Sequence, residues 1–373
     1  MKILLDPQIF NDQEFGGISR YYTEIFSRLS KMREVRIDIP IVSSRNVYLK
    51  ESVLFGKKLQ RYVYISSLLS KIGISIRKKT KKMHEKKIFD ALNKNDFDLF
   101  IPTYYDPYFL DYIGNKPFVL TVYDMVHELF PEYFIDDPHE VVKRKKILIE
   151  KATKIIAVSY NTKKDILTIY PDVDPTKIHV IYHGNSLRIN INVQIDLPRN
   201  FILFVGKREY YKNFYFLVNN IQDLLEKDKS LKLVCAGGGE FSEEEIKFID
   251  NLRLTNQIIQ KSFADAELAW FYKNAKCFVF PSAYEGFGIP VLESMACGCP
   301  VVLTNNSSFP EVAGDAGLFY DLNDGNDLKT KISLLLENED LRQSYSEKGL
   351  LQVKKFDWDE AAKQCLEVYS EAL

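Results

Sequence analysis

The chain alternates short apolar segments with longer amphipathic ones, and it does so in two successive series. The first half holds six strand candidates, at 2–6, 35–42, 98–101, 118–122, 154–158 and 178–181. The second half repeats the scheme at 201–205, 231–235, 257–260, 277–280, 300–303 and 317–320. Helical patterns lie between the strands, for example at 18–32, 162–170 and 327–338. Because such alternation is typical of parallel sheets covered on both faces, we predict an α/β fold with two Rossmann-like, doubly wound domains.

Length and charge support a division into two domains. The chain has 373 residues, more than a single hydrophobic core usually serves. Its net charge of −1 hides an asymmetry, because residues 1–185 hold 30 Lys and Arg against 23 Asp and Glu, whereas the remainder holds 20 against 28. The polar stretch 183–200 is the best linker. We therefore expect one domain over 1–185, with a basic partner surface, and a second over 186–355.

Composition narrows the class of protein. Apolar residues make up 46% and charged residues 27%, as in soluble globular proteins. The five cysteines are odd in number and form no C-x-x-C pair, which predicts reduced thiols and a cytoplasmic protein; Cys297 and Cys299 are read as core residues rather than metal ligands. No apolar run reaches about 18 residues, and the start meets Asp6 and Pro7 too soon for a signal peptide. A nearly neutral chain without a recognised module is not expected to bind nucleic acid.

The segment 280–321 carries the strongest functional pattern. A strand-like run ends at Phe280, and Glu285 and Glu293 then flank the turn Gly286-Phe287-Gly288 that opens into a helix. The glycines let backbone approach a ligand, and Pro290 suits a first helical turn. A helix start attracts an anion, and carboxylates accept hydrogen bonds from hydroxyl groups. This combination indicates a binding site for a sugar joined to a nucleotide diphosphate.

The same segment resembles the signature of the retaining glycosyltransferases of family 4, in which two glutamates are separated by seven residues. The resemblance implies the GT-B architecture, with two domains facing across a cleft and a last helix, within 356–373, that crosses back to the first domain. It also implies that Glu285 orients the sugar and that Glu293 holds the ribose. The other donor-binding residues would be Gly286, Phe287, Gly288, Ile289, Pro290, Val291 and Leu292. The alternative for Glu293 is an exposed residue that complements the helix dipole.

A second donor-binding segment follows the strand at 201–205, in the sequence GKREYYKN. Lysine and arginine form charge-assisted hydrogen bonds with phosphate. Relatives usually carry Arg directly after the glycine and Lys five residues later. Lys212 matches the second position, whereas Lys207 occupies the first with Arg208 beside it. The resemblance therefore implies a diphosphate site made by Gly206, Lys207, Arg208 and Lys212; loose charges on a solvated turn are the alternative.

Further candidates lie in the first half. Gly16 and Gly17 precede a helix and resemble the N-terminal glycine loop of the family, with Arg20 on the first turn beside them. After the strand at 118–122, Tyr123 stands where many relatives carry His; Asp124 fits the pattern, and His127 either supplies an imidazole to the reaction or serves the structure. Acceptor-side residues are predicted after the strand at 98–101, namely Tyr104, Tyr105 and Asp106, together with Arg20 and Tyr123.

The features predict a metal-independent and cofactor-free hexosyltransferase, and the resemblance to family 4 implies that it is retaining and serves surface-polysaccharide synthesis. Lys and Arg and a helix start meet the phosphate charge, so no divalent metal is demanded; the D-x-D triplets at 96–98, 172–174 and 357–359 lack the architecture of a metal site. GDP-mannose is the first expectation for the donor and a UDP-hexose the second, with a glycan or lipid-linked acceptor. A nucleotide-sugar epimerase and a catalytically silent sugar-nucleotide-binding subunit remain alternatives.

Residues 57–87 hold eleven Lys and Arg and a single acid, Glu85, interleaved with apolar residues at near-helical spacing. A basic face beside an apolar one is typical of a helix that lies on an anionic membrane. We therefore expect peripheral association with the inner face of the cell membrane, the alternative being a stripe that packs on the first domain.

Overall fold

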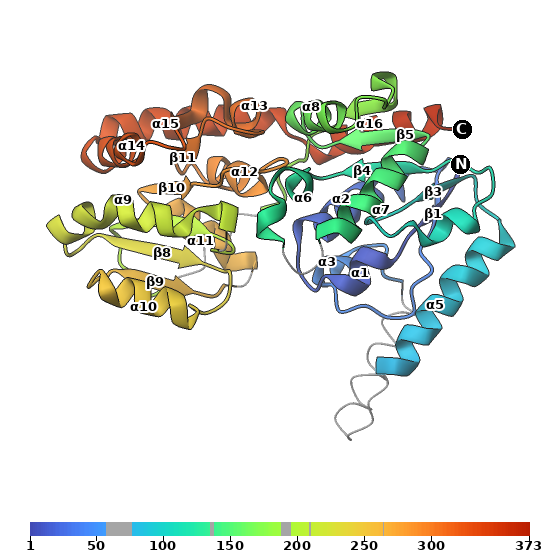
Figure 1. The fold of residues 1–373 in the computed structure, drawn as a ribbon, viewed down its shortest axis with the longest axis horizontal. Helices are drawn as coiled ribbons and strands as arrows, with labels where there is room; N and C mark the ends of the chain where they lie inside the picture. Colours follow the sequence, from blue (N-terminus) through green and yellow to red (C-terminus); the bar gives the residue numbers. More distant parts are fainter. Residues whose placement is uncertain (57–76, 135–137, 188–194, 209, 264) are drawn as a thin grey trace. The chain divides into compact units, whose positions relative to one another are not determined.

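The computed structural model describes residues 1–56, 77–134, 138–187, 195–208, 210–263 and 265–373, and it divides into two units (Figure 1). Unit 1 comprises Met1–His183 and Trp358–Leu373, and unit 2 comprises Gly184–Asp357. Both divisions of the chain lie two residues from the expected boundaries after 185 and 355. The C-terminal segment that the resemblance assigned to the first domain belongs to unit 1.

The strands of unit 1 are parallel and follow the expected segments. They are β1 (Lys2–Leu5), β2 (Arg36–Asp38), β3 (Leu99–Ile101), β4 (Val119–Val122), β5 (Lys154–Ala157) and β6 (Ile178–Val180). The order β2-β1-β3 and the order β4-β5-β6 are joined by a parallel bridge between Phe100 and Phe118. β2 is shorter than the expected 35–42, because it is an edge strand and Pro40 has no N–H to donate to a ladder.

The helices of unit 1 are α1 (Gln8–Asp12), α2 (Gly17–Leu29), α3 (Val47–Glu51), α5 (Arg77–Lys94), α6 (Val126–Leu129), α7 (Pro138–Lys151), α8 (Tyr160–Ile169) and α16 (Trp358–Glu371). The last of these packs along α2 and touches β5. Tyr21 lies against Trp358, the rings of Phe26 and Tyr369 stack 6.1 Å apart, and Arg28 Nε donates to Asp359. Aromatic packing together with ion pairs from Arg28 to Asp359 and from Lys154 to Glu371 thus ties the C-terminal helix to unit 1.

Unit 2 contains one six-stranded parallel sheet. Its strands are β7 (Phe201–Val205), β8 (Lys232–Ala236), β9 (Ile258–Lys261), β10 (Cys277–Phe280), β11 (Val301–Thr304) and β12 (Gly317–Tyr320). Their order is β12-β11-β10-β7-β8-β9. Numbered within the unit, this is the Rossmann order, in which the chain reverses direction across the sheet between β7 and β10.

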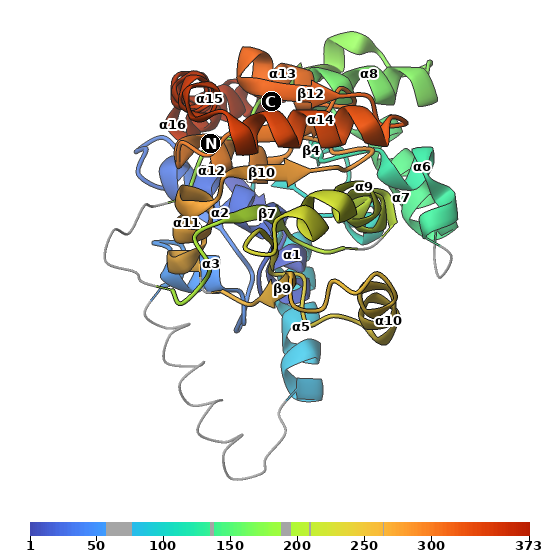
Figure 2. The same cartoon turned by 90° about the vertical axis from the view of Figure 1, so that its left-hand side faces the viewer.

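Helices cover both faces of the unit 2 sheet: α9 (Phe214–Lys227), α10 (Glu243–Asn251), α11 (Asp265–Asn274), α12 (Ile289–Ala296), α13 (Phe309–Ala313), α14 (Gly325–Glu337) and α15 (Glu339–Gln352). Figure 2 shows α9 and α10 on one side of the strands and α11 and α12 on the other. Alternation along β10 explains this arrangement, since Cys277 and Val279 join the core under α9 and α14 whereas Phe278 packs on Tyr272 of α11. Because helices cover both faces, β7 and β10 are buried and apolar along their whole length, as expected for such a parallel sheet.

Candidate functional site

Two loops leave the carboxyl ends of β7 and β10, which are neighbours in the sheet although they are far apart in the sequence. The first loop spans 206–213 and the second 281–288. In doubly wound folds, ligands bind in the crevice where adjacent strands send their connections to opposite faces. The sequence predicted donor-binding residues in both loops, and the strand order brings the two loops together.

Main-chain groups and one ion pair join the two loops. The Ala283 amide donates to the Tyr211 carbonyl at 2.8 Å, and Asn213 Nδ2 donates to the Pro281 carbonyl at 3.0 Å. Lys212 Nζ then forms an ion pair with Glu285 Oε1. The Lys212 and Glu285 side chains are 19% and 15% exposed, so the pair is largely shielded and still open on one side. Two residues predicted from separate motifs thus contact each other directly.

The Lys212 ammonium also lies near two aromatic faces. It is 4.9 Å from the centre of the Tyr211 ring and 5.1 Å from that of Phe280. Aromatic faces attract cations, so the rings and the carboxylate together hold a positive charge at the ends of β7 and β10. The ammonium group is therefore already in position to bind an anionic ligand.

Ser307 and Ser308 fix the main chain of Glu285. The Glu285 amide donates to Ser307 Oγ at 3.0 Å, and Ser308 Oγ donates to the carbonyls of Glu285 and Phe287, each at 2.9 Å. The sequence interpretation missed both serines. They follow β11, the neighbour of β10, so the rule that parallel strands end at one edge is the available signal.

Gly288 shapes the start of α12. Its φ of 94° is left-handed, and a Cβ at this position would lie 3.2 Å from the Phe309 ring and 3.4 Å from Val291. Glycine therefore meets both a conformational and a steric requirement. Pro290 lies in the first turn of the helix, as expected. The turn Gly286-Phe287-Gly288 leads into this helix start, where free amides and the helix dipole favour an anion.

Glu293 lies on the buried side of α12 together with Val291 and Leu292, whereas Ile289 and Pro290 are partly exposed. The Glu293 residue is 4% exposed and accepts a hydrogen bond from the Tyr272 hydroxyl at 3.2 Å. The alternative of an exposed residue that complements the dipole is therefore wrong. Tyr272 lies on α11 and was not predicted; burial, and then the charge of Glu293, raise the pKa of its hydroxyl. A buried carboxylate held in this way suits recognition of hydroxyl groups.

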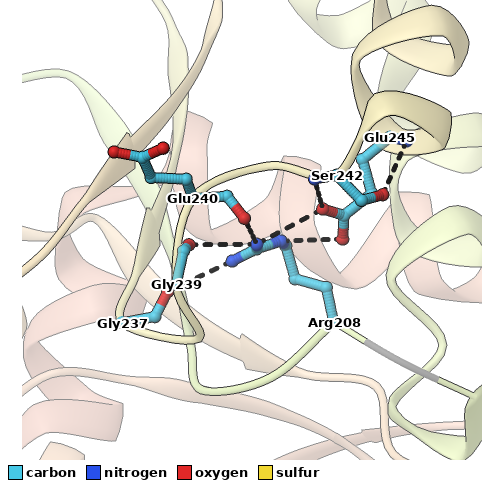
Figure 3. Close-up of polar contacts among 6 residues, drawn as sticks. All are labelled: Arg208, Gly237, Gly239, Glu240, Ser242 and Glu245. Atoms are coloured by element: carbon cyan, nitrogen blue, oxygen red, sulfur yellow. Dashed lines mark hydrogen bonds and ion pairs between the residues drawn. The ribbon is translucent and has the colours of Figure 1, made fainter.

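Arg208 is surrounded by protein acceptors in the loop after β7 (Figure 3). Its Nε donates to Glu245 Oε1 at 2.8 Å, Nη1 donates to the Gly237 carbonyl at 3.1 Å, and Nη2 donates to the carbonyls of Gly239 and Glu240 at 3.1 and 2.9 Å. Glu245 in turn accepts from the Ser242 amide in the capping box of α10. Protein groups thus engage all three guanidinium nitrogens. These contacts give Arg208 a structural role, and its predicted contact with a diphosphate stays a prediction.

The other members of this loop differ in exposure. Lys207 is exposed, next to the buried Arg208. Gly206 has a φ of 106° and donates from its amide to the Ala236 carbonyl at 2.9 Å. A Cβ on Gly238 would lie 2.2 Å from the Gly206 carbonyl oxygen, so the loops after β7 and β8 pack backbone to backbone. Lys207 and Lys212 remain the predicted cations for a diphosphate.

In unit 1 the predicted glycine loop caps α2. Gly16 is the N-cap residue, and a Cβ there would lie 2.2 Å from Gln13 Oε1, which accepts a hydrogen bond from the Ser19 amide. Gly17 is exposed at the first helical position. Arg20 donates to the Tyr48 hydroxyl at 2.8 Å, with its guanidinium 4.6 Å from the centre of that ring. Tyr48 therefore orients Arg20 at the start of the helix, a contact that the sequence did not suggest.

The predicted acceptor-side residues divide between surface and core. Tyr105 and Tyr123 are buried, and the Tyr123 amide donates to the Tyr105 hydroxyl at 3.1 Å. Tyr123 also packs edge-on against Tyr21 and Tyr22. These contacts give both side chains a packing role, and their predicted contact with an acceptor stays a prediction. Tyr104 is partly buried, which raises the pKa of its hydroxyl to about 12, and Asp106 caps the short helix Pro107–Asp111.

Asp124 and His127 lie beside a buried ion pair. Lys145 Nζ contacts Glu128 at 2.9 Å with both side chains shielded, and it donates to the Asp124 carbonyl at 3.1 Å. His127 packs against Phe134 with ring centres 4.1 Å apart and the ring planes tilted by 31°. Burial, and then the charge of Lys145, lower the pKa of His127, so the imidazole is neutral at pH 7. Lys145 thus holds the predicted segment 123–127 in place.

One buried acid escaped the sequence interpretation. Asp6 follows β1 and accepts a hydrogen bond from the Tyr108 hydroxyl at 2.7 Å. Burial raises the pKa of Asp6 to about 6, against the lowering effect of this hydrogen bond. In the sequence, Asp6 appears only as a break in an apolar run, and a sequence pattern gives no measure of burial for an acid that directly follows a strand.

Two further expectations concern metal binding and membrane association. Among the described residues, no group of three or more His, Cys, Asp or Glu side chains is placed to hold a metal ion. Of the basic segment 57–87, residues 57–76 lie outside the described part of the chain, and residues 77–87 belong to α5. Within the ranges that the structure covers, no helix is both long enough and apolar enough to cross a membrane.

The sequence matches two family models. Residues 15–187 match the model described as glycosyltransferase family 4, and residues 188–352 match the model described as glycosyl transferases group 1. O-antigen chain mannosyltransferase B of Escherichia coli is 27% identical over 95% of both chains. O-antigen chain mannosyltransferase RfbU of Salmonella typhimurium is 29% identical over 57% of this chain and 62% of that protein.

Solved structures agree on the fold. Sucrose-phosphate synthase from Thermosynechococcus elongatus gives a TM-score of 0.75 at 18% identity, with 100% of this chain and 98% of that one covered. HepE of Anabaena, solved with UDP and glucose, gives 0.72 at 18% identity and 99% coverage of both chains. With the two family models, the Rossmann order of unit 2 and the paired motifs at its edge, the chain belongs to glycosyltransferase family 4 and is a GT-B glycosyltransferase.

Proposed function

We propose that this glycosyltransferase moves a hexose, mannose in the first instance, from a nucleotide diphosphate to a hydroxyl group of a glycan or lipid-linked acceptor, with retention at the anomeric carbon. The observation that carries the proposal is the meeting of Lys212 and Glu285 at the carboxyl ends of β7 and β10. A cation for the diphosphate and an acceptor group for sugar hydroxyls lie side by side, next to the start of α12.

The chemistry requires charge stabilisation more than a protein nucleophile. The bond between the anomeric carbon and the phosphate oxygen breaks, and a bond to the acceptor oxygen forms on the same face. The leaving diphosphate gains negative charge, which Lys212, Lys207 and the amide end of α12 stabilise. The leaving phosphate oxygen takes the proton of the acceptor hydroxyl. Because these groups meet the charge, the proposed reaction needs neither a divalent metal nor another cofactor.

Glu293 has the proposed task of binding the ribose. Its carboxylate is buried and held by Tyr272, which limits its motion. Two vicinal hydroxyl groups can donate to one carboxylate, and a restrained acceptor loses little entropy on binding them. In unit 1, Gly16, Gly17, Arg20, Tyr104, Asp106, Asp124 and His127 remain the proposed contacts to the phosphate, the sugar and the acceptor.

The relatives inform the choice of donor. Two of them are named as O-antigen mannosyltransferases, which supports a mannosyl donor and an acceptor that belongs to a surface polysaccharide. HepE has been solved with UDP and glucose, which keeps a UDP-hexose as the second donor. Because these relatives are transferases by name, they do not favour an epimerase or a silent binding subunit.

A transfer assay tests the proposal. The purified chain is incubated with GDP-mannose or UDP-glucose and a panel of lipid-linked and free glycan acceptors, and the anomeric proton of the product is observed by NMR. An α-linked product from an α-linked donor, formed equally well in EDTA, is expected. Loss of activity in EDTA with rescue by manganese or magnesium would contradict metal independence. A changed sugar released without acceptor would indicate an epimerase, and binding without transfer or hydrolysis a silent subunit.

The proposed place of action is the cytoplasmic face of the membrane. Its support is the basic and apolar sequence of residues 57–87, since lysine and arginine near an anionic surface contribute about 1 kcal/mol each. Co-sedimentation with anionic liposomes at low salt, and its loss with neutral liposomes or at high salt, is expected. Equal and negligible binding under all conditions would remove the membrane association and leave the transferase proposal intact.

A further inference from the structure

The ion pair between Lys212 and Glu285 joins two residues that the proposed function assigns to different parts of the donor. Lys212 is assigned to the diphosphate and Glu285 to the sugar, so the inference below rests on that function. In the structure the two side chains satisfy each other. A ligand that binds one of them therefore competes with the other for it.

We infer that Glu285 competes with the diphosphate for Lys212, and that the sugar hydroxyls compensate Glu285 only when the intact donor binds. The pair thus selects the nucleotide sugar over the nucleoside diphosphate that remains after transfer. Glu285 acquires a role in specificity and product release in addition to orienting the sugar.

The burial of the pair makes this competition consequential. At 19% and 15% exposure, neither side chain regains full hydration when it loses its partner. A nucleoside diphosphate supplies a new partner to Lys212 but none to Glu285, whose carboxylate then lies near the phosphates without its cation. A nucleotide sugar supplies phosphate to Lys212 and hydroxyl donors to Glu285, so both groups are paired again.

Hydrogen bonds of the surrounding main chain restrict how far Lys212 and Glu285 can separate. The hydrogen bonds from Ala283 to Tyr211 and from Asn213 to Pro281 hold the two loops together. Ser307 and Ser308 bind the main chain of Glu285. Rotation of the side chains is therefore the available way to separate the pair, and within this frame the two groups stay close to each other.

Calorimetric titration of GDP and GDP-mannose, and of UDP and UDP-glucose, tests the inference. The Glu285→Gln variant should bind the nucleoside diphosphate roughly tenfold more tightly than the wild type, because Lys212 is released from its partner. Its preference for the nucleotide sugar over the nucleoside diphosphate should fall. The matched control is Glu337→Gln, which removes the same charge from an exposed position on α14 and should change neither affinity.

A double-mutant cycle separates competition from simple repulsion between Glu285 and the phosphates. In a Lys212→Met background, Glu285→Gln should no longer tighten binding of the nucleoside diphosphate, because no lysine remains to be released. Equal tightening in both backgrounds would overturn the inference, as would unchanged or weaker binding by Glu285→Gln. If the glutamine variant fails to fold, Glu285→Asp serves, since the shorter carboxylate withdraws from Nζ and should also tighten binding.

Different results would contradict the proposed function and the competition for Lys212. If the wild-type chain binds neither a nucleoside diphosphate nor a nucleotide sugar, the proposed function itself is contradicted. If the wild type binds both but Glu285→Gln does not favour the diphosphate, the proposed function stands and the competition does not.

Discussion

Two basic residues on the loop after β7 form ion pairs of opposite character. Arg208 is enclosed, and its nitrogens reach Glu245 and three main-chain carbonyls. Lys212 meets a single carboxylate, Glu285, and the pair is still partly open to solvent. A cation with several protein partners supports the fold, whereas a cation with one exchangeable partner can serve a ligand. The number of partners, more than the charge, separates structure from function here.

The geometry of the two pairs explains the difference. Arg208 joins β7 to the glycine-rich turn after β8 and to the capping box of α10, so it closes the loop within unit 2. Its planar fork suits several acceptors at once. Lys212 is a point charge on a flexible stem between Tyr211, Phe280 and Glu285. Such a group can change partners by rotating its side chain.

Removal of Arg208 should give the largest effect on stability. The Arg208→Met variant leaves Glu245 unpaired in a shielded site, and we expect unit 2 to lose roughly 3 to 5 kcal/mol of unfolding free energy. Chemical denaturation followed by fluorescence measures this loss. The control is Lys329→Met, whose partner Asp223 is exposed, with an expected cost of about 1 kcal/mol or less. Similar costs for both variants would break the comparison.

Asp6 extends the comparison to a buried carboxyl group. It accepts a hydrogen bond from the Tyr108 hydroxyl, whereas Glu245 and Glu285 each pair with a cation. Its folded pKa of about 6 lies above the usual 3.8, so the stability from its protonated form is complete below pH 4 and is lost as the pH rises through 6. At pH 8 the cost is roughly 3 kcal/mol. Asp6→Asn should therefore gain stability relative to the wild type between pH 4 and pH 8. A difference that does not vary with pH would contradict the assignment.

Replacement of Glu293 sharpens the assignment of the nucleotide. Glu293→Ala should weaken nucleotide binding by roughly 1 to 3 kcal/mol, the range for lost hydrogen bonds to a charged group. Tyr272→Phe, which removes only the partner of the carboxylate, should have a smaller effect. Glu285→Ala should instead chiefly lower turnover. Unchanged affinity and turnover in the Glu293 and Glu285 variants would refute the site.

The strands could be predicted because apolar runs of strand length recur with helices between them. The positions of Glu285 and Lys212 also followed from the sequence, but their contact did not, since it depends on β7 and β10 being neighbours. Arg208 illustrates the limit in the other direction. Its hydrogen-bond acceptors lie at 237–245, and the sequence around Arg208 does not indicate that the fold brings these acceptors to it.

The tyrosines show a second limit. Tyr104 and Tyr105 are adjacent and chemically identical, yet only Tyr105 is buried with its hydroxyl on the Tyr123 amide. Which of two neighbours after a strand faces the core depends on the direction of the loop. Ser307 and Ser308 lie within the segment 280–321, but the sequence does not single them out for a similar reason, because only the fold brings the end of β11 to Glu285.

The central claim is that Lys212 is the exchangeable cation that meets the donor diphosphate. The most direct measurement compares calorimetric affinities of GDP and UDP with those of guanosine and uridine, for the wild type and for Lys212→Met. The variant should lose affinity for the preferred diphosphate by roughly 1.5 to 3 kcal/mol, and it should bind the bare nucleoside as the wild type does. Equal losses for diphosphate and nucleoside, or no loss for either, would contradict the account.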